Sequence, residues 1–485
     1  MLDFTVNPEG RAAAIRQAKS RGIVIPTLAQ QAGREPTPPA IRARLATTEL
    51  WSVDPVNLFR IRWDNEPRPD GGGFGGINYL ELPPGLTGVA TRIVALVGKW
   101  FPTGAHKVGA AFGCLVPPLV TGQFDPERHQ AAWPSTGNFC RGGAYDSAVL
   151  GCRSIAILPE GMSRERFDWL ATIAGRVIKT PGTESNVKEI FDECWRLRQS
   201  GQEISIFNQF EDLGNYLWHY AVTGPAVARV LEGLGPRARY HGLTLATGSA
   251  GTIASGDYLK TLFPASKIAA VEATQCPTML RNGYGSHRIE GIGDKHIPWI
   301  HNVRNTDVVI GVDDQAPLDL IRLFNEPAGR RYLGSLGISQ PIIDSLPLVG
   351  ISGACNLVAA IKLAKLHGTG PDDVIVTVLT DSIDLYQSRL AELRQAHGEL
   401  TDAGAMAAHH RYLKGLGTDE MIDLTLDDRR RIHNLKYFTW VEQQGRAVAE
   451  LDRQWADPTY WSDLAAQSEP LDALIDEFNR EVAAA

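Results

Sequence analysis

The stretch YHGLTLATGSAGTIASGDYLKTLF at residues 240–263 has the pattern of a buried strand, a glycine-rich turn and a helix. Other apolar runs rich in Val and Ile also indicate strands, among them RIVALV at 92–97, SIAILPE at 154–160 and DVIVTVLTDS at 373–382. Segments of helical spacing separate them, such as RERFDWLATIA at 164–174. Strands that alternate with helices of this length predict an α/β fold whose mainly parallel sheet is covered on both faces.

The size and composition of the chain limit its function classes. A length of 485 residues favours two or three domains, and 44% apolar with 21% charged residues is typical of a globular protein. The net charge is −7 and no basic run is present, which argues against nucleic acid as a partner. No apolar run reaches the roughly 18 residues of a membrane span, so no membrane partner is expected. The N-terminus lacks a secretory signal pattern, and a cytoplasmic location is therefore expected.

The six cysteines give no sign of a metal site. They form no C-x-x-C pair, and no group of Cys and His has the spacing of metal ligands. We therefore expect reduced, buried thiols and no bound metal. Cys140 differs from the others only because it lies inside a candidate binding motif.

A candidate reactive amine lies in FPTGAHKVGAAFG at residues 101–113. Lys107 follows a turn with Pro102 and Gly104 and begins a helix of small residues. An apolar setting desolvates an amine and favours the neutral, nucleophilic form that imine formation with an aldehyde needs. Taken alone, the pattern also fits a solvated surface lysine.

Two short turns are candidate anion sites. PSTGNFCRGGAYDSA at 134–148 offers hydroxyls and free backbone N–H groups where a helix starts, which predicts a pocket for a carboxylate or, more simply, a helix cap. ATGSAGT at 246–252 lies between a strand and a helix, where backbone amides and the helix dipole bind phosphate. Its spacing is neither G-x-G-x-x-G nor that of the P-loop, which disfavours a nicotinamide-dependent oxidoreductase. A later strand ends in the polar pair Asp381-Ser382.

In this order, the lysine, the two turns and the polar strand end resemble the cysteine synthase and cystathionine β-synthase family. The resemblance covers residues 92–386, and the TGAHK segment is also similar to tryptophan synthase β chains. The stretches that carry it are PTGAHK, STGN, ILPEGMSRERFDWLATIAGRVIKTPG (157–182), FNQFEDLGNYLWHYAVTGP (207–225), GSAGT, NGYGSHRIEGIG (282–293) and GISGA (350–354).

The resemblance implies a pyridoxal 5'-phosphate (PLP) enzyme of fold type II, with two open three-layer α/β domains and the cofactor between them. Residues 101–211 would form the smaller, mobile domain with the substrate loop, and residues 81–100 with 212–390 the larger PLP-binding domain. An N-terminal extension (1–80) and a helical C-terminal extension (391–485) would flank them. A homodimer is implied. The helical pattern at 435–455 would close the active site, form a dimer contact or pack on the core.

The resemblance also assigns roles to residues. Lys107 would hold PLP as a Schiff base and move the Cα proton, and Asn138 would hydrogen-bond the 3'-oxygen. Ser382 would face the pyridine nitrogen, where a hydroxyl leaves the ring largely unprotonated and favours loss of a β-substituent over transamination. The phosphate would be bound by Gly248, Ser249, Ala250, Gly251 and Thr252. The substrate would be bound by Ser135, Thr136, Gly137, Asn138 and Gln209.

The implied activity is β-replacement on a small L-amino acid, an activated serine or a cysteine-like donor, through an α-aminoacrylate that takes up a thiol or other nucleophile. Two alternatives stay open: β-elimination to a 2-oxo acid, and a non-catalytic family member that binds a partner protein. The chain departs from the family at Val108-Gly109 and at Phe139-Cys140-Arg141, which leaves the donor and the nucleophile open. Arg141 either binds a second anionic group of the substrate or forms an ion pair.

Overall fold

Two sheets organise the computed structural model, which describes residues 1–68, 73–183, 187–293 and 295–484. The strands are β1 (Tyr79–Leu82), β2 (Arg92–Val97), β3 (Gln130–Pro134), β4 (Arg153–Pro159), β5 (Arg176–Thr180), β6 (Ile204–Ile206), β7 (Arg239–Ala246), β8 (Lys267–Ala273), β9 (Val308–Val312), β10 (Asp373–Leu379) and β11 (Met421–Asp423). Within the described residues, the larger sheet has the order β1-β2-β10-β7-β8-β9-β11 and the smaller β5-β4-β3-β6. Among the strands that the structure describes, only the edge strands β1 and β11 pair antiparallel. The predicted α/β fold with mainly parallel sheets is confirmed.

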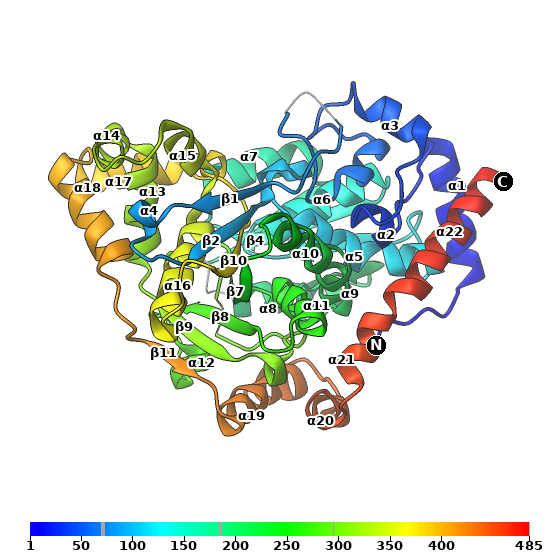
Figure 1. Cartoon of the computed structure of the whole chain (residues 1–485). Coiled ribbons are helices and arrows are strands. Elements are labelled where there is room, and N and C mark those ends of the chain that lie inside the picture. The colour runs from blue at the N-terminus through cyan, green and yellow to red at the C-terminus, as the bar shows by residue number, and fades with distance from the viewer. Residues whose placement is uncertain (69–72, 184–186, 294, 485) are drawn as a thin grey trace.

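Helices cover these sheets, as Figure 1 shows. The helices from Lys107 to His367 are α5 (Lys107–Thr121), α6 (Asn138–Val149), α7 (Arg164–Ile173), α8 (Val187–Arg198), α9 (Leu213–Trp218), α10 (Gly224–Gly233), α11 (Ala254–Leu262), α12 (Thr278–Arg281), α13 (Gln315–Asn325), α14 (Pro327–Ser335), α15 (Gln340–Ser345) and α16 (Ile351–His367), of which α14 and α15 pack on other helices. Alternate residues of a strand face opposite sides of its sheet. Accordingly, Ile93 of β2 shares an apolar cluster with α16, whereas Val94 shares one with α5.

The smaller sheet is formed by the segment that was predicted to be the smaller domain. Helix α6 packs on β3 and β4, and α8 contacts all four strands. Helix α5 packs against both α6 and α9, so its first residue lies where elements of the two sheets meet. The domain boundaries themselves stay a prediction.

The chain ends pack on each other. The N-terminal helices are α1 (Pro8–Arg21), α2 (Leu28–Gln31), α3 (Pro39–Leu45) and α4 (Pro84–Thr87), and those after the last parallel strand are α17 (Gln387–His397), α18 (Asp402–His409), α19 (Leu426–Asn434), α20 (Val448–Ala456), α21 (Tyr460–Ala466) and α22 (Ser468–Ala484). Helices α1 and α22 lie side by side (Figure 1). Arg11 donates to Glu481 at 2.7 Å, and Asn479 exchanges hydrogen bonds with the backbone of Ile25 at 3.0 and 2.8 Å.

The segment 435–455 packs on the core. The chain here forms a π-helical turn at Tyr437–Gln443, followed by helix α20. Trp440 in that turn is buried against Phe191 and Phe210, and its indole N–H donates to the carbonyl of Ile297 at 2.7 Å. Of the three alternatives expected for this segment, these contacts support packing on the core.

Two further properties concern the whole of the described chain. No single helix in it is long and apolar enough to cross a membrane. One pair of helical segments, Gln340–Leu348 and Ile351–His367, has sufficient combined length and apolar composition, but the two are bent by 119° at their junction. All six cysteines are buried free thiols.

Candidate active site

Lys107 lies in two adjoining cavities at the carboxyl ends of β3, β7 and β10. Both cavities are lined by Lys107, Gly248, Gly291, Ile292 and Thr380. The Nζ of Lys107 donates to Ser249 Oγ at 2.8 Å and to Gln209 Oε1 at 3.3 Å. The carboxyl ends of parallel strands are where ligands bind in open α/β sheets. The lysine thus contacts two other predicted site residues at the expected edge of the sheets.

The glycine-rich turn after β7 passes close to the lysine. Gly248, Ser249, Ala250 and Thr252 line one cavity with Lys107. The turn is tight: Ala250 has a φ of 62°, and a Cβ added to Gly248 would lie 2.9 Å from the carbonyl oxygen of Gly291. Gly251 N–H donates to Ser249 Oγ at 3.3 Å and begins the turn that leads into α11. The backbone of this turn therefore lies beside the lysine, where the sequence predicts a phosphate.

The STGN loop lies on the other side of Lys107. Ser135, Thr136, Asn138 and Gln209 line the second cavity with it. Ser135 Oγ accepts hydrogen bonds from Gly137 N–H and from Gln209 Nε2, both at 3.1 Å. Gln209 thereby connects the loop to the lysine. The predicted carboxylate site and the predicted amine are thus brought together.

Ser382 is not brought to Lys107. Strand β10 ends at Leu379, and the chain turns so that Ser382 Oγ accepts from Asp384 N–H at 3.4 Å. Ser382 lines a separate cavity with Trp51 and Lys99. Thr380, and not Ser382, is the hydroxyl residue after β10 that lines the lysine cavities.

Arg141 is buried away from the predicted carboxylate site. It donates to the carbonyl of Thr103 at 2.9 Å, and its guanidinium lies 4.6 Å from the ring centre of Trp169 and 5.4 Å from that of Trp51. Burial lowers the pKa of Arg141 to about 10, and the nearby charge of Arg166 adds to this. The side chain packs between aromatic rings because Phe139-Cys140-Arg141 lies within α6, which faces the core.

Two buried asparagines complete the site and were missed from the sequence. Asn215 Nδ2 donates to Ser249 Oγ and to the carbonyl of Gln209, both at 3.0 Å. Asn356 lines the cavity, accepts from Ala246 N–H at 2.8 Å and donates to a backbone carbonyl of β10 at 2.8 Å. A single amide inside the apolar segments LGNYLW and GACNLVAA was the available signal, because such a residue needs a specific partner when buried.

The polar atoms around the cavities fit a phosphorylated ring cofactor. Within the described chain, buried side-chain atoms without a hydrogen-bond partner include both ring nitrogens of His106, Oδ1 of Asn138, Oδ1 of Asn215 and Oγ of Ser352. His106 and Ser352 line the phosphate-turn cavity. Burial and the adjacent Lys107 lower the pKa of His106 to about 3, so its ring is neutral. Buried polar atoms cost free energy until a ligand or water binds them. The Ser352 hydroxyl and the N–H of the neutral His106 ring can donate to phosphate oxygens, whereas the two asparagine Oδ1 atoms only accept.

The comparisons with known proteins agree with this geometry. Residues 100–335 match the family model described as pyridoxal-phosphate dependent enzyme. Over 289 residues the chain is 28% identical to a probable cysteine synthase of Bacillus subtilis, covering 59% of this chain and 85% of that protein. Over 258 residues it is 30% identical to the cysteine synthase of Staphylococcus aureus, covering 53% of this chain and 74% of that protein.

One solved structure supports the fold alone. The crystal structure of cysteine synthase from Entamoeba histolytica has a TM-score of 0.56 and 21% sequence identity, and the match covers 70% of this chain and 94% of that one. The sequence matches and the two cavities around Lys107 lead to the same conclusion about the family. The chain belongs to the pyridoxal-phosphate-dependent enzymes of fold type II, in the family of cysteine synthases and cystathionine β-synthases.

Proposed function

We propose that this enzyme catalyses β-replacement on a small L-amino acid, an activated serine or a cysteine-like donor, with a thiol or other nucleophile as the second substrate. The observation that carries the proposal is the contact of Lys107 Nζ with both Ser249 and Gln209, which connects the amine to the phosphate turn and to the substrate loop. The cysteine synthase relatives support the same reaction class.

Lys107 would hold the cofactor through Nζ, and the same atom would accept the proton from the substrate α-carbon. When bound, PLP supplies an electron-withdrawing ring that stabilises negative charge at that carbon. The turn from Gly248 to Thr252 would bind the phosphate through its backbone N–H groups at the start of α11. Asn138 would donate its amide to the ring oxygen.

The substrate loop would bind the α-carboxylate through Ser135, Thr136, Gly137 and Asn138, with Gln209 orienting the loop. The side chains of Ser135, Asn138 and Gln209 are all buried. A site that excludes water strengthens each of these polar contacts and leaves the β-carbon to the second substrate instead of solvent.

One assay separates the two reactions. The enzyme is incubated with an activated serine, with and without a thiol, and the thioether product and pyruvate are both measured. Replacement predicts that the thiol diverts the donor from pyruvate to the thioether. Equal rates of pyruvate formation in both reactions would contradict replacement.

A second experiment locates the cofactor. After borohydride reduction and digestion, the peptide with Lys107 should carry the mass of a pyridoxyl group, and the peptide with Lys99 should not. Lys99 is a matched control because it lies in the preceding segment and pairs with Asp384 at 2.6 Å. A protein that takes up no cofactor would favour the non-catalytic alternative.

Assembly and location belong to the same proposal. A homodimer and a cytoplasmic setting are the states expected of this enzyme. The smaller unit, residues 101–211, is proposed to move relative to the larger when substrate binds.

A further inference from the structure

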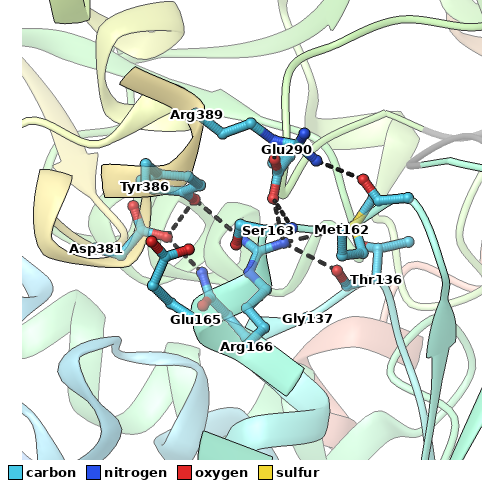
Figure 2. Close-up of polar contacts among 12 residues, drawn as sticks. Thr136, Gly137, Met162, Ser163, Glu165, Arg166, Glu290, Asp381, Tyr386 and Arg389 are labelled. Atoms are coloured by element: carbon cyan, nitrogen blue, oxygen red, sulfur yellow. Dashed lines mark hydrogen bonds and ion pairs between the residues drawn. The ribbon is translucent and has the colours of Figure 1, made fainter. Parts of the chain in front are cut away.

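A buried ionic network lies directly behind the substrate loop (Figure 2). At its centre is Arg166 of α7, whose side chain is 0% exposed. The guanidinium lies 2.8 Å from a carboxylate oxygen of Glu290, donates to the carbonyl of Thr136 at 3.0 Å and donates to the hydroxyl of Tyr386 at 3.0 Å. One side chain of the smaller unit therefore contacts both the substrate loop and two segments of the larger unit.

The first arm of this network supports the loop backbone. Thr136 supplies the accepting carbonyl, and the next residue, Gly137, has a φ of 155°. A Cβ added to Gly137 would lie 2.6 Å from the guanidinium carbon of Arg166. The glycine is needed here because the guanidinium packs directly on the peptide that leads into α6.

The second arm reaches Asn138 through two side chains. The Tyr386 hydroxyl donates to Asp381 Oδ2 at 2.6 Å, and Asn138 Nδ2 donates to the same oxygen at 2.6 Å. A carboxylate only accepts hydrogen bonds, so Asp381 determines which way the Asn138 amide is turned. The second N–H of that amide stays available for the ring oxygen of the cofactor.

Two buried carboxylates, Glu290 and Asp381, and a second arginine complete the network. Glu290 is buried and also accepts from Arg389 at 2.5 Å, and Arg389 in turn donates to the carbonyl of Gly161. Burial raises the pKa of Asp381, while the charge of Arg166 and the hydrogen bonds from Tyr386 and Asn138 lower it. A buried ion pair adds little net stability because desolvation offsets the attraction. Fixing the geometry of the residues around Arg166 therefore explains this network better than a contribution to the free energy of unfolding does.

We propose that Arg166 is a positioning residue that orients the substrate loop through the Thr136 carbonyl and the Asn138 amide through Tyr386 and Asp381. It does not touch the reacting atoms. The inference rests on the proposed function, since it assumes that the loop binds the substrate carboxylate and that Asn138 contacts the cofactor ring.

The two arms give two separable readouts. In R166Q both arms are lost: KM for the donor amino acid is expected to rise about tenfold, since a hydrogen bond from a charged group contributes on that scale. The visible absorbance band of the bound cofactor is expected to shift as well. Y386F removes only the second arm, so the band should shift and the cofactor should dissociate faster, while KM should rise less than in R166Q because the contact of Arg166 with the Thr136 carbonyl is kept.

Two further variants separate positioning from stability. Arg322 is a matched control, because it is buried in α13, pairs with Glu326 at 2.6 Å and donates to the Gly398 carbonyl. R322Q should lower the melting temperature and leave the band and KM unchanged. R166K should recover most of the melting temperature but not KM, because one ammonium cannot replace the planar guanidinium in several directions.

Three results would contradict the positioning role of Arg166, its second arm or the proposed function. R166Q with a lowered melting temperature, like R322Q, but a wild-type band and KM would overturn the positioning role. If R166Q does not fold, an unchanged band and cofactor dissociation rate in Y386F would overturn the second arm. A wild-type protein that shows no cofactor band after PLP is added would instead contradict the proposed function.

Discussion

The side-chain amide of Asn215 lies 3.0 Å from the hydroxyl of Ser249, so helix α9 is tied to the glycine-rich turn after β7. Lys107 donates to the same hydroxyl at 2.8 Å. A single oxygen thus receives hydrogen bonds from the amine of one segment and the amide of another. The position of Lys107 relative to the glycine-rich turn therefore depends on this shared acceptor, Ser249 Oγ.

Replacement of Ser249 by alanine should weaken cofactor binding about tenfold, because the turn loses a hydroxyl predicted to bind the phosphate and Asn215 loses the acceptor that ties the turn to α9. Titration of the apoenzyme with PLP, followed by absorbance, measures the change. Thr261→Ala is the control: its exposed hydroxyl caps a carbonyl in α11 without contacting the site. Equal affinities of S249A and T261A would contradict this role for Ser249.

Gly137→Ala should disturb the substrate loop. Its φ of 155° and the 2.6 Å approach of Arg166 leave no room for a methyl group, so we expect a loss of about 2–3 kcal/mol in the free energy of unfolding. Urea unfolding and KM for the donor are both measured. Gly233→Ala in α10 has no heavy atom within 4 Å of the added carbon and should be tolerated. A G137A enzyme as stable and as active as G233A would contradict the close packing of Arg166 on the loop.

The carboxyl of Asp212 should make stability depend on pH. Burial raises the pKa of Asp212 to about 7, so the native state binds the proton more tightly than the unfolded chain does. Its contribution is fully present below the unfolded pKa of about 4 and is lost as the pH rises through about 7. In Asp212→Asn, the side-chain oxygen can still accept from Gly214 N–H, as it does at 2.9 Å, without any charge. Urea unfolding from pH 4 to pH 8 should show a smaller decline in the variant than in the wild type, and identical profiles would contradict the shift.

The cysteines should be unreactive in the folded enzyme. Burial raises the pKa of Cys140 to about 12, and the thiols of Cys152 and Cys194 are likewise raised to about 12. The thiolate is the reacting form, so a maleimide should label none of them in native buffer and all of them in urea. Mass spectrometry of the labelled peptides gives the result. Native labelling of Cys140, which lies in α6 just after the substrate loop, would contradict its burial in the folded enzyme.

Local patterns predicted the fold class and most of the cavity. The strand at 240–246 and the turn that follows it are contiguous, so their periodicity and glycine content were readable in one short window. The same holds for the segment around Lys107 and for STGN. The structure places Ser249 and Ser135 in two adjoining cavities, both of which are lined by Lys107.

Contacts between segments that are distant in the chain could not be predicted from such local sequence patterns. Ser382 and Thr380 differ by two positions, and only the turn after β10 decides that Thr380 lines the lysine cavities. Arg141 follows a binding motif in sequence, yet the packing of α6 turns it toward two tryptophan rings. In both cases a residue next to a motif points elsewhere because packing, not sequence distance, determines its direction.

The sequence by itself determined the alternation of strands and helices and predicted a reactive lysine and two anion-binding turns, since each depends on residues that are neighbours in the chain. Only the tertiary structure decided that Arg166 reaches Thr136, Tyr386 and Glu290, and that α1 lies against α22. The physical reason is that such contacts depend on how two sheets and their helices pack. That packing is set by the summed burial of many side chains and leaves no local pattern.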